Sequence, residues 1–181
     1  MKKIFIIVAL ALAATSGIWW LGNREVTAVT SFEECVEAGN PVMESYPRQC
    51  RHEGVTFTEF VGNELEKSDL IRIESPRPNQ TISSPLVIRG EARGNWFFEA
   101  SFPVVLVDWD GRIIAESYAT AKGEWMTTDF VPFEAKVEFT IDPETWSNRG
   151  SLILRKDNPS GLPEHDDALE IPIYYGGLPK R

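Results

Sequence analysis

Two cysteines and a nearby histidine are the first residues of the chain whose types could do chemistry. Cys35 and Cys50 are the only cysteines, and His52 follows two positions after the second. A thioredoxin-like redox site needs Cys-x-x-Cys, which is absent, and a structural zinc site usually needs four ligands. The remaining alternatives are a Cys/Cys/His metal cluster and a structural disulfide between Cys35 and Cys50.

A second group of candidate residues lies in the acidic stretch "KDNPSGLPEHDDALE". It contains Asp157, Ser160, Glu164, His165, Asp166 and Asp167. Calcium takes six to eight oxygen ligands, which such a loop could supply. Ser160 and His165 could be imagined in a hydrolase, but no G-x-S-x-G elbow is present. We expect a solvated loop with no metal, no cofactor and no catalytic residues. The alternative is a calcium-dependent or hydrolytic envelope enzyme that uses Glu164–Asp167.

The segment "DWDG" brings two further carboxylates together. Asp108 and Asp110 match only a fragment of the EF-hand spacing, because the remaining ligands are missing. Asp110-Gly111 between two β-type runs is a strong hairpin signal. We therefore interpret this segment as a turn.

Three consecutive aromatic residues offer a different kind of site. Trp96, Phe97 and Phe98 lie in "GNWFF", the most apolar stretch that resembles a loop. Exposed at the end of a domain, these rings could bind a glycan or a protein. Buried, they would belong to the core, which is the more common fate of aromatic residues.

The compartment of these groups depends on the N-terminus. Lys2 and Lys3 precede an uncharged run from Ile4 to Gly22, long enough to span a bilayer. Residues 1–23 are predicted to be a signal anchor or a signal peptide; Trp19 and Trp20 favour the anchor. The anchor gives a single-pass cell-membrane protein with most of the chain extracytoplasmic, and cleavage gives a secreted protein. Both export the cysteines, so a disulfide is predicted.

The net charge of the exported part of the chain limits the classes of partner that it can bind. Removing Lys2 and Lys3 from the 18 basic residues leaves 16 against 27 acidic residues, a net charge of −11. Such a surface disfavours nucleic acid and anionic lipid. Contact with the membrane is expected through the N-terminal helix alone.

The elements that position these residues form two regions. Residues 31–62 read as a small module around Cys35 and Cys50. In this module Ser31 and Glu34 form a capping box for a helix that ends at Gly39. A unit of this size needs a covalent link to stay folded. The polar residues 63–69 read as a linker.

Residues 70–176 alternate between apolar and polar positions in short runs separated by turn residues. About seven strands are predicted, and no ten-residue segment holds a helical period. The predicted class is all-β, an antiparallel immunoglobulin-like β-sandwich.

Five segments of this region carry a family resemblance. They read "IRIESPRP", "SPLVIRGEA", "WFFEASF", "DWDGRIIA" and "PFEAKVEF". In this order they resemble the immunoglobulin-like domain of bacterial spore germination, the second GerMN-associated domain. The resemblance covers about residues 70–175 and implies an accessory domain on exported bacterial proteins, with no catalytic residues to carry over. We therefore expect a membrane-tethered, extracytoplasmic module that is not an enzyme and that binds an unknown envelope protein or glycan.

Overall fold

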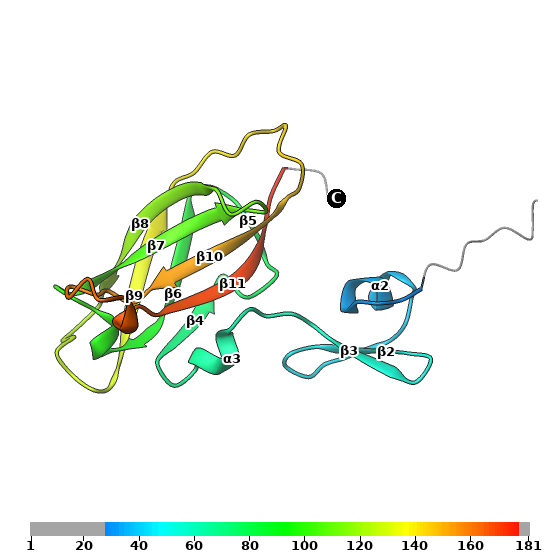
Figure 1. Ribbon diagram of the computed structural model, residues 1–181, viewed down its shortest axis with the longest axis horizontal. Coiled ribbons are helices and arrows are strands. Elements are labelled where there is room, and N and C mark those ends of the chain that lie inside the picture. Colours follow the sequence, from blue (N-terminus) through cyan, green and yellow to red (C-terminus); the bar gives the residue numbers. More distant parts are fainter. Residues whose placement is uncertain (1–27, 178–181) are drawn as a thin grey trace, which may run out of the picture. The chain divides into compact units, whose positions relative to one another are not determined.

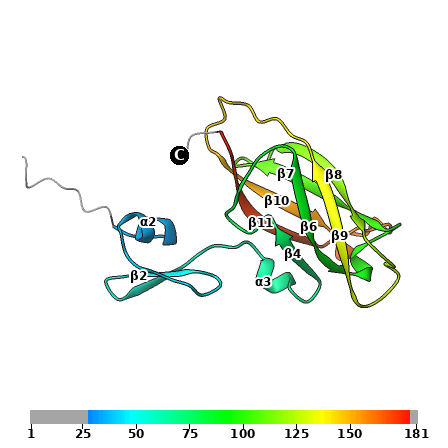
Figure 2. The same ribbon diagram turned by 180° about the vertical axis from the view of Figure 1, so that it is seen from behind.

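The chain divides into two compact units, residues 1–59 and residues 60–181, each with its own sheet (Figures 1 and 2). The computed structural model describes residues 28–177, so the membrane segment predicted for residues 1–23 lies outside the described residues. Within residues 28–177, no helix is both long and apolar enough to cross a membrane.

The first helix in the described part of this unit, residues 28–59, is α2, Phe32–Glu37. The Ser31 hydroxyl caps it by accepting the backbone N–H of Glu34 at 3.1 Å. The carboxylate of Glu34 accepts the backbone N–H of Thr30 at 2.6 Å and the Thr30 hydroxyl at 2.8 Å. These bonds lower the pKa of Glu34. The predicted capping pair is therefore present, with Glu34 reaching one residue further back than a capping box requires.

Three short strands complete this unit and pack against the helix through the disulfide. They are β1 (Val42–Met43), β2 (Gln49–His52) and β3 (Val55–Thr58), antiparallel in the order β1-β2-β3. Cys35, on α2, is bonded to Cys50, on β2, and both are fully buried. The small core around them contains Phe32, Val29, Val42 and Phe57.

The second unit is one curled sheet of eight strands, in the order β4-β6-β9-β8-β7-β10-β11-β5. Its strands are β4 (Ile71–Ser75), β5 (Thr81–Ile82), β6 (Leu86–Arg93), β7 (Ser101–Asp108), β8 (Ile113–Ala121), β9 (Phe130–Val137), β10 (Arg149–Arg155) and β11 (Ala168–Tyr175). Helices η1 (Gly94–Trp96) and η2 (Pro163–His165) lie in the connections.

Two features of this sheet differ from the prediction. The sheet is mixed, because β5 pairs with β11 in parallel while every other described pair in it is antiparallel. It also has eight strands rather than about seven. The additional strand is the two-residue β5, which is too short to show an alternating pattern in the sequence.

The core lies between two arms of the sheet. Strands β8 and β9 pair only at Thr120–Glu134 and Ala121–Phe133, and the sheet folds over at this junction. Phe102 on β7 then meets Phe133 on β9 with ring centroids 5.0 Å apart, edge to face. The alternating pattern of β9, with Val131, Phe133, Ala135 and Val137 buried, arises because one face of the strand packs on this core.

Residues 63–69, for which a linker is predicted, contain the one-turn helix α3, Glu64–Lys67. Lys67 pairs with Asp167 at 2.5 Å, and Glu64 pairs with Arg77 at 2.7 Å. Burial raises the pKa of Glu64, and the charge of Arg77 opposes that shift. Just before the helix, Gly62 has φ +71° and lies so close to the carbonyl of Glu170 that a Cβ would collide with it. These contacts hold the segment against the sheet.

Candidate functional site

The fold brings two of the predicted candidate regions together in one open groove. The aromatic stretch after β6 forms one wall, and the loop between β10 and β11 forms the other. The backbone N–H of Asp157 donates to the carbonyl of Trp96 at 3.0 Å and fixes the two walls to each other. The groove has a volume of about 400 Å³ and is lined by Asn95, Phe97, Phe98, Lys156, Asp157, Asn158, Pro159, Ser160 and His165.

The three aromatic residues have different roles. Trp96 and Phe97 are only 1 % and 4 % exposed, and Phe97 packs on Phe102 with ring centroids 5.2 Å apart. Phe98 is 42 % exposed. Of the three aromatic residues predicted as candidate ligand contacts, Phe98 is therefore the one that a ligand could reach, while the other two anchor the wall in the core.

A tight turn with an unfavourable backbone holds Phe98 in place. Phe98 and Ser101 form an antiparallel bridge with two hydrogen bonds of 3.0 Å. The two residues between them, Glu99 and Ala100, have φ of +49° and +61°. Two consecutive positive φ values belong to a type I′ hairpin turn, which normally contains Asn and Gly. Residues with a Cβ adopt this region at a cost of about 1–2 kcal/mol each.

Asn158 organises the opposite wall. Its Oδ1 accepts the Ser160 hydroxyl at 2.5 Å and the Ser160 backbone N–H at 3.2 Å. Its Nδ2 donates to the carbonyl of Leu162 and to Asp166 Oδ1, both at 2.8 Å. The loop predicted to be solvated is exposed at residues 159–166, and hydrogen bonds between its own side chains order it.

Ser160 and His165 are brought within hydrogen-bonding distance, at 3.0 Å between Oγ and Nδ1. A serine hydroxyl has one proton, and the short contact assigns it to Asn158 Oδ1. The Ser160 oxygen also accepts the Leu162 backbone N–H at 3.2 Å. Which of Ser160 and His165 donates in their own contact depends on the histidine tautomer.

Two carboxylates of the acidic loop have partners of their own. Asp167 pairs with Lys67, and Asp166 accepts from Asn158. Across residues 28–177, no group of three or more His, Cys, Asp or Glu side chains is arranged to hold a metal ion.

Asp108, the other predicted acidic candidate, is part of the β7–β8 turn. Its side chain is 2 % exposed and pairs with Arg112 at 3.0 Å. Its Oδ1 accepts the backbone N–H groups of Asp110 and Arg112, both at 2.9 Å. Gly111 has φ +76°, as expected for the turn that Asp110-Gly111 predicts.

The charge of Asp108 also acts on Tyr175, whose hydroxyl donates to the Val107 carbonyl at 3.0 Å. Burial, and after it that charge, raises the pKa of Tyr175.

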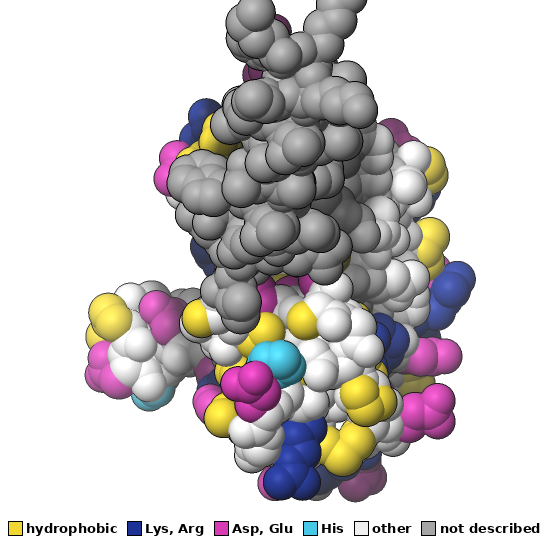
Figure 3. Space-filling view, turned by 90° about the vertical axis from the view of Figure 1, so that its right-hand side faces the viewer, with side chains coloured by type: hydrophobic (Ala, Val, Ile, Leu, Met, Phe, Trp, Pro, Cys, Tyr) yellow, Lys and Arg dark blue, Asp and Glu magenta, His cyan; other side chains and the backbone are white. Residues whose placement is uncertain are grey.

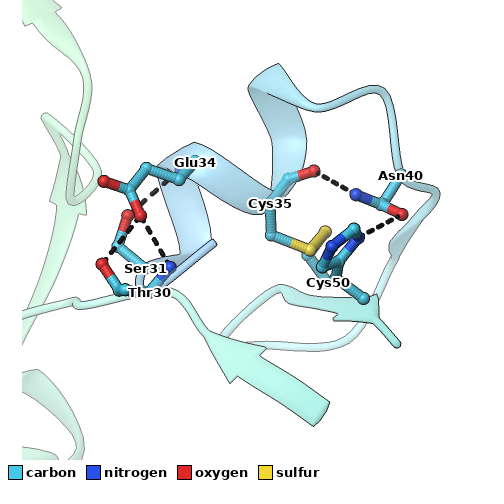
Figure 4. The surroundings of a disulfide bond; sticks show 7 residues. Thr30, Ser31, Glu34, Cys35, Asn40 and Cys50 are labelled. Carbon is cyan, nitrogen blue, oxygen red and sulfur yellow. Dashed lines mark hydrogen bonds between the residues drawn. A yellow bond between two sulfur atoms is a disulfide. The ribbon is translucent and has the colours of Figure 1, made fainter. Parts of the chain in front are cut away.

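The disulfide of the first unit lies among hydrogen bonds between polar groups (Figure 4). Asn40 Nδ2 donates to the carbonyl of Cys35 at 2.9 Å, and Asn40 Oδ1 lies 3.2 Å from His52 Nδ1. The histidine beside the cysteines is therefore a neighbour of Asn40, and the two sulfur atoms are bonded to each other. The predicted disulfide is confirmed.

One ion pair of this unit was not predicted from the sequence. Arg48 Nε and Nη2 donate to the two carboxylate oxygens of Glu59 at 2.8 and 2.6 Å, and the Glu59 side chain is 6 % exposed. The guanidinium also lies over the Phe32 ring, 5.4 Å from its centroid. The pair joins the start of β2 to the residue after β3, and the hydrogen bond to Glu59 raises the pKa of Arg48. Nothing in the spacing of two isolated charges signals such a bidentate contact.

A family model matches residues 70–161, and its description is the immunoglobulin-like domain of bacterial spore germination, Gmad2. The chain belongs to this family. The Gmad2 match covers β4 to β10 and most of the groove, from Asn95 to Ser160, and stops before His165. The first unit and α3 lie outside it. The comparisons with curated proteins and with solved structures found no match.

Proposed function

We propose that this protein is a membrane-tethered, extracytoplasmic binding module of the bacterial cell envelope, without catalytic activity. The observation that carries the proposal is the groove beside Phe98. There a half-exposed ring lies next to the side chains of Asn95, Lys156 and Asp157, which make no hydrogen bond or ion pair within residues 28–177. Such a combination of an apolar ring and unpaired polar groups is typical of a binding site.

The hydrogen bonds of the groove support binding rather than catalysis. The Ser160 hydroxyl donates to Asn158 Oδ1 at 2.5 Å, a bond that competes with transfer of its proton to His165. A hydrolase also needs a third group that orients its histidine, and no bond to His165 Nε2 is found among the described residues. The calcium alternative has no three-ligand cluster in the same part of the chain.

Two features support this location. The disulfide between Cys35 and Cys50 indicates an oxidising, extracytoplasmic compartment. Residues 1–23 have the length and hydropathy of a membrane anchor, which would keep both units at the cell surface. Acidic and basic side chains are interspersed on the described part of the face shown in Figure 3, as on a surface exposed to water.

We also propose that the two arms of the curled sheet are the layers of an immunoglobulin-like sandwich. One layer is β4-β6-β9 and the other is β8-β7-β10-β11-β5. The short strand β5 leaves the first layer and joins the second beside β11. The Phe102–Phe133 contact between the layers supports this interpretation.

Site-specific photo-cross-linking in the bacterium that makes the protein tests the proposal. A photoreactive phenylalanine analogue at position 98 should form an adduct with an envelope component. The same analogue at Tyr118, which is 64 % exposed on β8, should not. Equal labelling from both positions, or adducts with cytoplasmic components, would contradict the proposal.

A further inference from the structure

We infer that the groove beside Phe98 binds a neutral glycan, an oligosaccharide whose sugars present hydroxyl and acetamido groups. The inference rests on the proposed function and names the class of its ligand. It depends on four properties of the groove: the exposed ring, the unpaired polar groups, the absence of a strand edge in either wall, and the charge.

The ring provides a surface for the C–H face of a sugar. Phe98 is 42 % exposed, while its neighbour Phe97 is buried and fixes the wall. The positive φ values of Glu99 and Ala100 hold the turn that presents the ring. Backbone strain of this kind persists where the surrounding structure requires it and is concentrated at ligand-binding positions.

The unpaired side chains match the hydrogen-bonding groups of a sugar. Asn95 offers both a donor and an acceptor, Lys156 offers donors, and Asp157 offers acceptors. Hydroxyl and acetamido groups both donate and accept, so each of these three residues can find a counterpart. The remaining polar residues, Asn158 and Ser160, are already bonded to each other and keep the loop rigid.

The walls of the groove favour a glycan over an extended peptide. A peptide that binds by strand addition needs an unpaired strand edge. Both walls here are loops, and the strand-like contacts in them, Phe98 with Ser101 and the Lys156 backbone N–H with the Asp167 carbonyl, are already closed. The groove of about 400 Å³ is within the range of small-molecule sites, roughly 300–1,000 Å³.

The charge favours a neutral ligand. The groove contains one lysine and one aspartate whose side chains are unpaired, and these balance each other. The part of the chain beyond Lys3 has a net charge of −11, which repels acidic polysaccharides and nucleic acids.

Binding of defined tetrasaccharides to the exported part of the protein, residues 24–181 with both units and the disulfide, tests the inference. The probes are a β-1,4-linked N-acetylglucosamine tetramer and a β-1,4-linked glucose tetramer, measured by calorimetry and by NMR chemical shifts. Binding of either tetramer, with shifts at Phe98, Asn95 and Asp157, is the expected result. Preference for the first would show that the acetamido group is recognised.

Three variants distinguish binding at this groove from nonspecific binding elsewhere on the surface. Phe98→Ala should weaken binding at least about tenfold, which corresponds to about 1.4 kcal/mol. Asp157→Asn tests the polar wall and should weaken it too. Tyr118→Ala, at an exposed tyrosine of β8, should change the affinity less than about twofold.

The outcomes also distinguish this inference from the proposed function. The inference that the groove binds a glycan would be wrong if neither tetramer bound. It would also be wrong if the Tyr118→Ala variant lost as much affinity as the Phe98→Ala variant. If position 98 nevertheless cross-links to an envelope protein in the cell, the protein is a binding module whose ligand is a polypeptide. If position 98 gives neither a sugar complex nor an adduct, both proposals fail.

Discussion

Asn63 and Glu170 are more than a hundred positions apart in the chain and exchange two hydrogen bonds. The backbone N–H of Asn63 donates to the Glu170 carbonyl at 3.1 Å, and Asn63 Oδ1 accepts the Glu170 backbone N–H at 2.8 Å. A third bond runs from Asn63 Nδ2 to the Ala168 carbonyl at 3.0 Å. Asn63 thus satisfies main-chain groups of β11 in the way that a neighbouring strand would.

Replacing this side chain should weaken the second unit. Asn63→Ala removes two bonds to β11 and should lower the free energy of unfolding by about 1–2 kcal/mol. Asn95→Ala is the matched control, because Asn95 is exposed and makes no bond within residues 28–177; its effect should stay below about 0.5 kcal/mol. Chemical denaturation followed by tryptophan fluorescence measures both. Equal effects would mean that the Asn63 bonds add nothing to stability.

The same contacts locate the start of an independently folding fragment. A fragment of residues 60–177 retains Asn63 and the ion pairs of Glu64 and Lys67, whereas one of residues 70–177 lacks them. The shorter fragment should fold but be less stable by at least about 2 kcal/mol. Thermal unfolding of the two fragments measures the difference. Identical transitions would mean that residues 63–69 behave as the linker predicted from their composition.

The disulfide should stabilise the first unit and have no effect on the stability of the second. Cys35 and Cys50 are separated by 15 residues, and a cross-link of that length stabilises by about 3 kcal/mol in the chain-entropy model. The Cys35→Ser/Cys50→Ser double variant should therefore lose the structure of residues 28–59. Amide hydrogen exchange should show rapid exchange in β2 and β3, with the protection of β6 to β11 unchanged. Protection that persists in β2 would show that the core of this unit suffices without the bond.

Tyr175 should make the second unit sensitive to alkali. Its pKa is raised in the folded state above the ordinary value of 10.0. The unfolded chain therefore loses this proton first, and stability falls as the pH rises above about 10, by about 1.4 kcal/mol per pH unit. The Tyr175→Phe variant lacks the hydrogen bond to the Val107 carbonyl, so at pH 7 its free energy of unfolding should be lower by about 1 kcal/mol. Because it has no phenol to titrate, it should not lose further stability above about pH 10. Chemical denaturation at pH 8 to 11 measures both free energies of unfolding, and their difference should shrink as the pH rises. A difference that stays constant would contradict the prediction.

Substitutions in the turn that presents Phe98 should make the protein more stable. Glu99→Asn with Ala100→Gly supplies the residues that a type I′ turn prefers and should raise the free energy of unfolding by about 1–2 kcal/mol. Glu99→Gln keeps the unfavourable φ and serves as the control for the lost charge. Denaturant midpoints measure all three proteins. No gain in the double variant would show that the turn carries no strain.

Sequence patterns predict those parts of the molecule in which a local rule determines the outcome. Strand β9 alternates because one face packs on the core, and Asp110-Gly111 can form the β7–β8 turn because glycine tolerates φ +76°. The disulfide is predicted from export, together with the absence of a Cys-x-x-Cys motif and of four zinc ligands.

Other parts depend on contacts that no local pattern encodes. Strand β5 pairs in parallel with β11 only because the sheet curls to bring them together. The candidate groove joins loops about sixty positions apart, so the sequence showed an aromatic stretch and an acidic loop without showing that they are neighbours. Three consecutive rings could not be sorted into buried and exposed, since the sorting depends on the unusual turn at Glu99 and Ala100. Residues 63–69 are polar, as a linker would be, but Asn63 binds the main chain of β11, and Glu64 and Lys67 form ion pairs with Arg77 and Asp167.

The position of β11 has a consequence for biogenesis. This strand pairs with β10 and β5 and receives the Asn63 bonds, so it joins three segments that emerge earlier from a translocation channel. During export from the N-terminus, the first unit can close its disulfide as soon as β3 has crossed. The second unit cannot complete its sheet until β11 arrives, so until then the edge of β10 that pairs with β11 stays free. Under the proposed location, export would separate the maturation of the two units in time, and an extracytoplasmic chaperone would meet the second unit as a sheet that lacks its final strand.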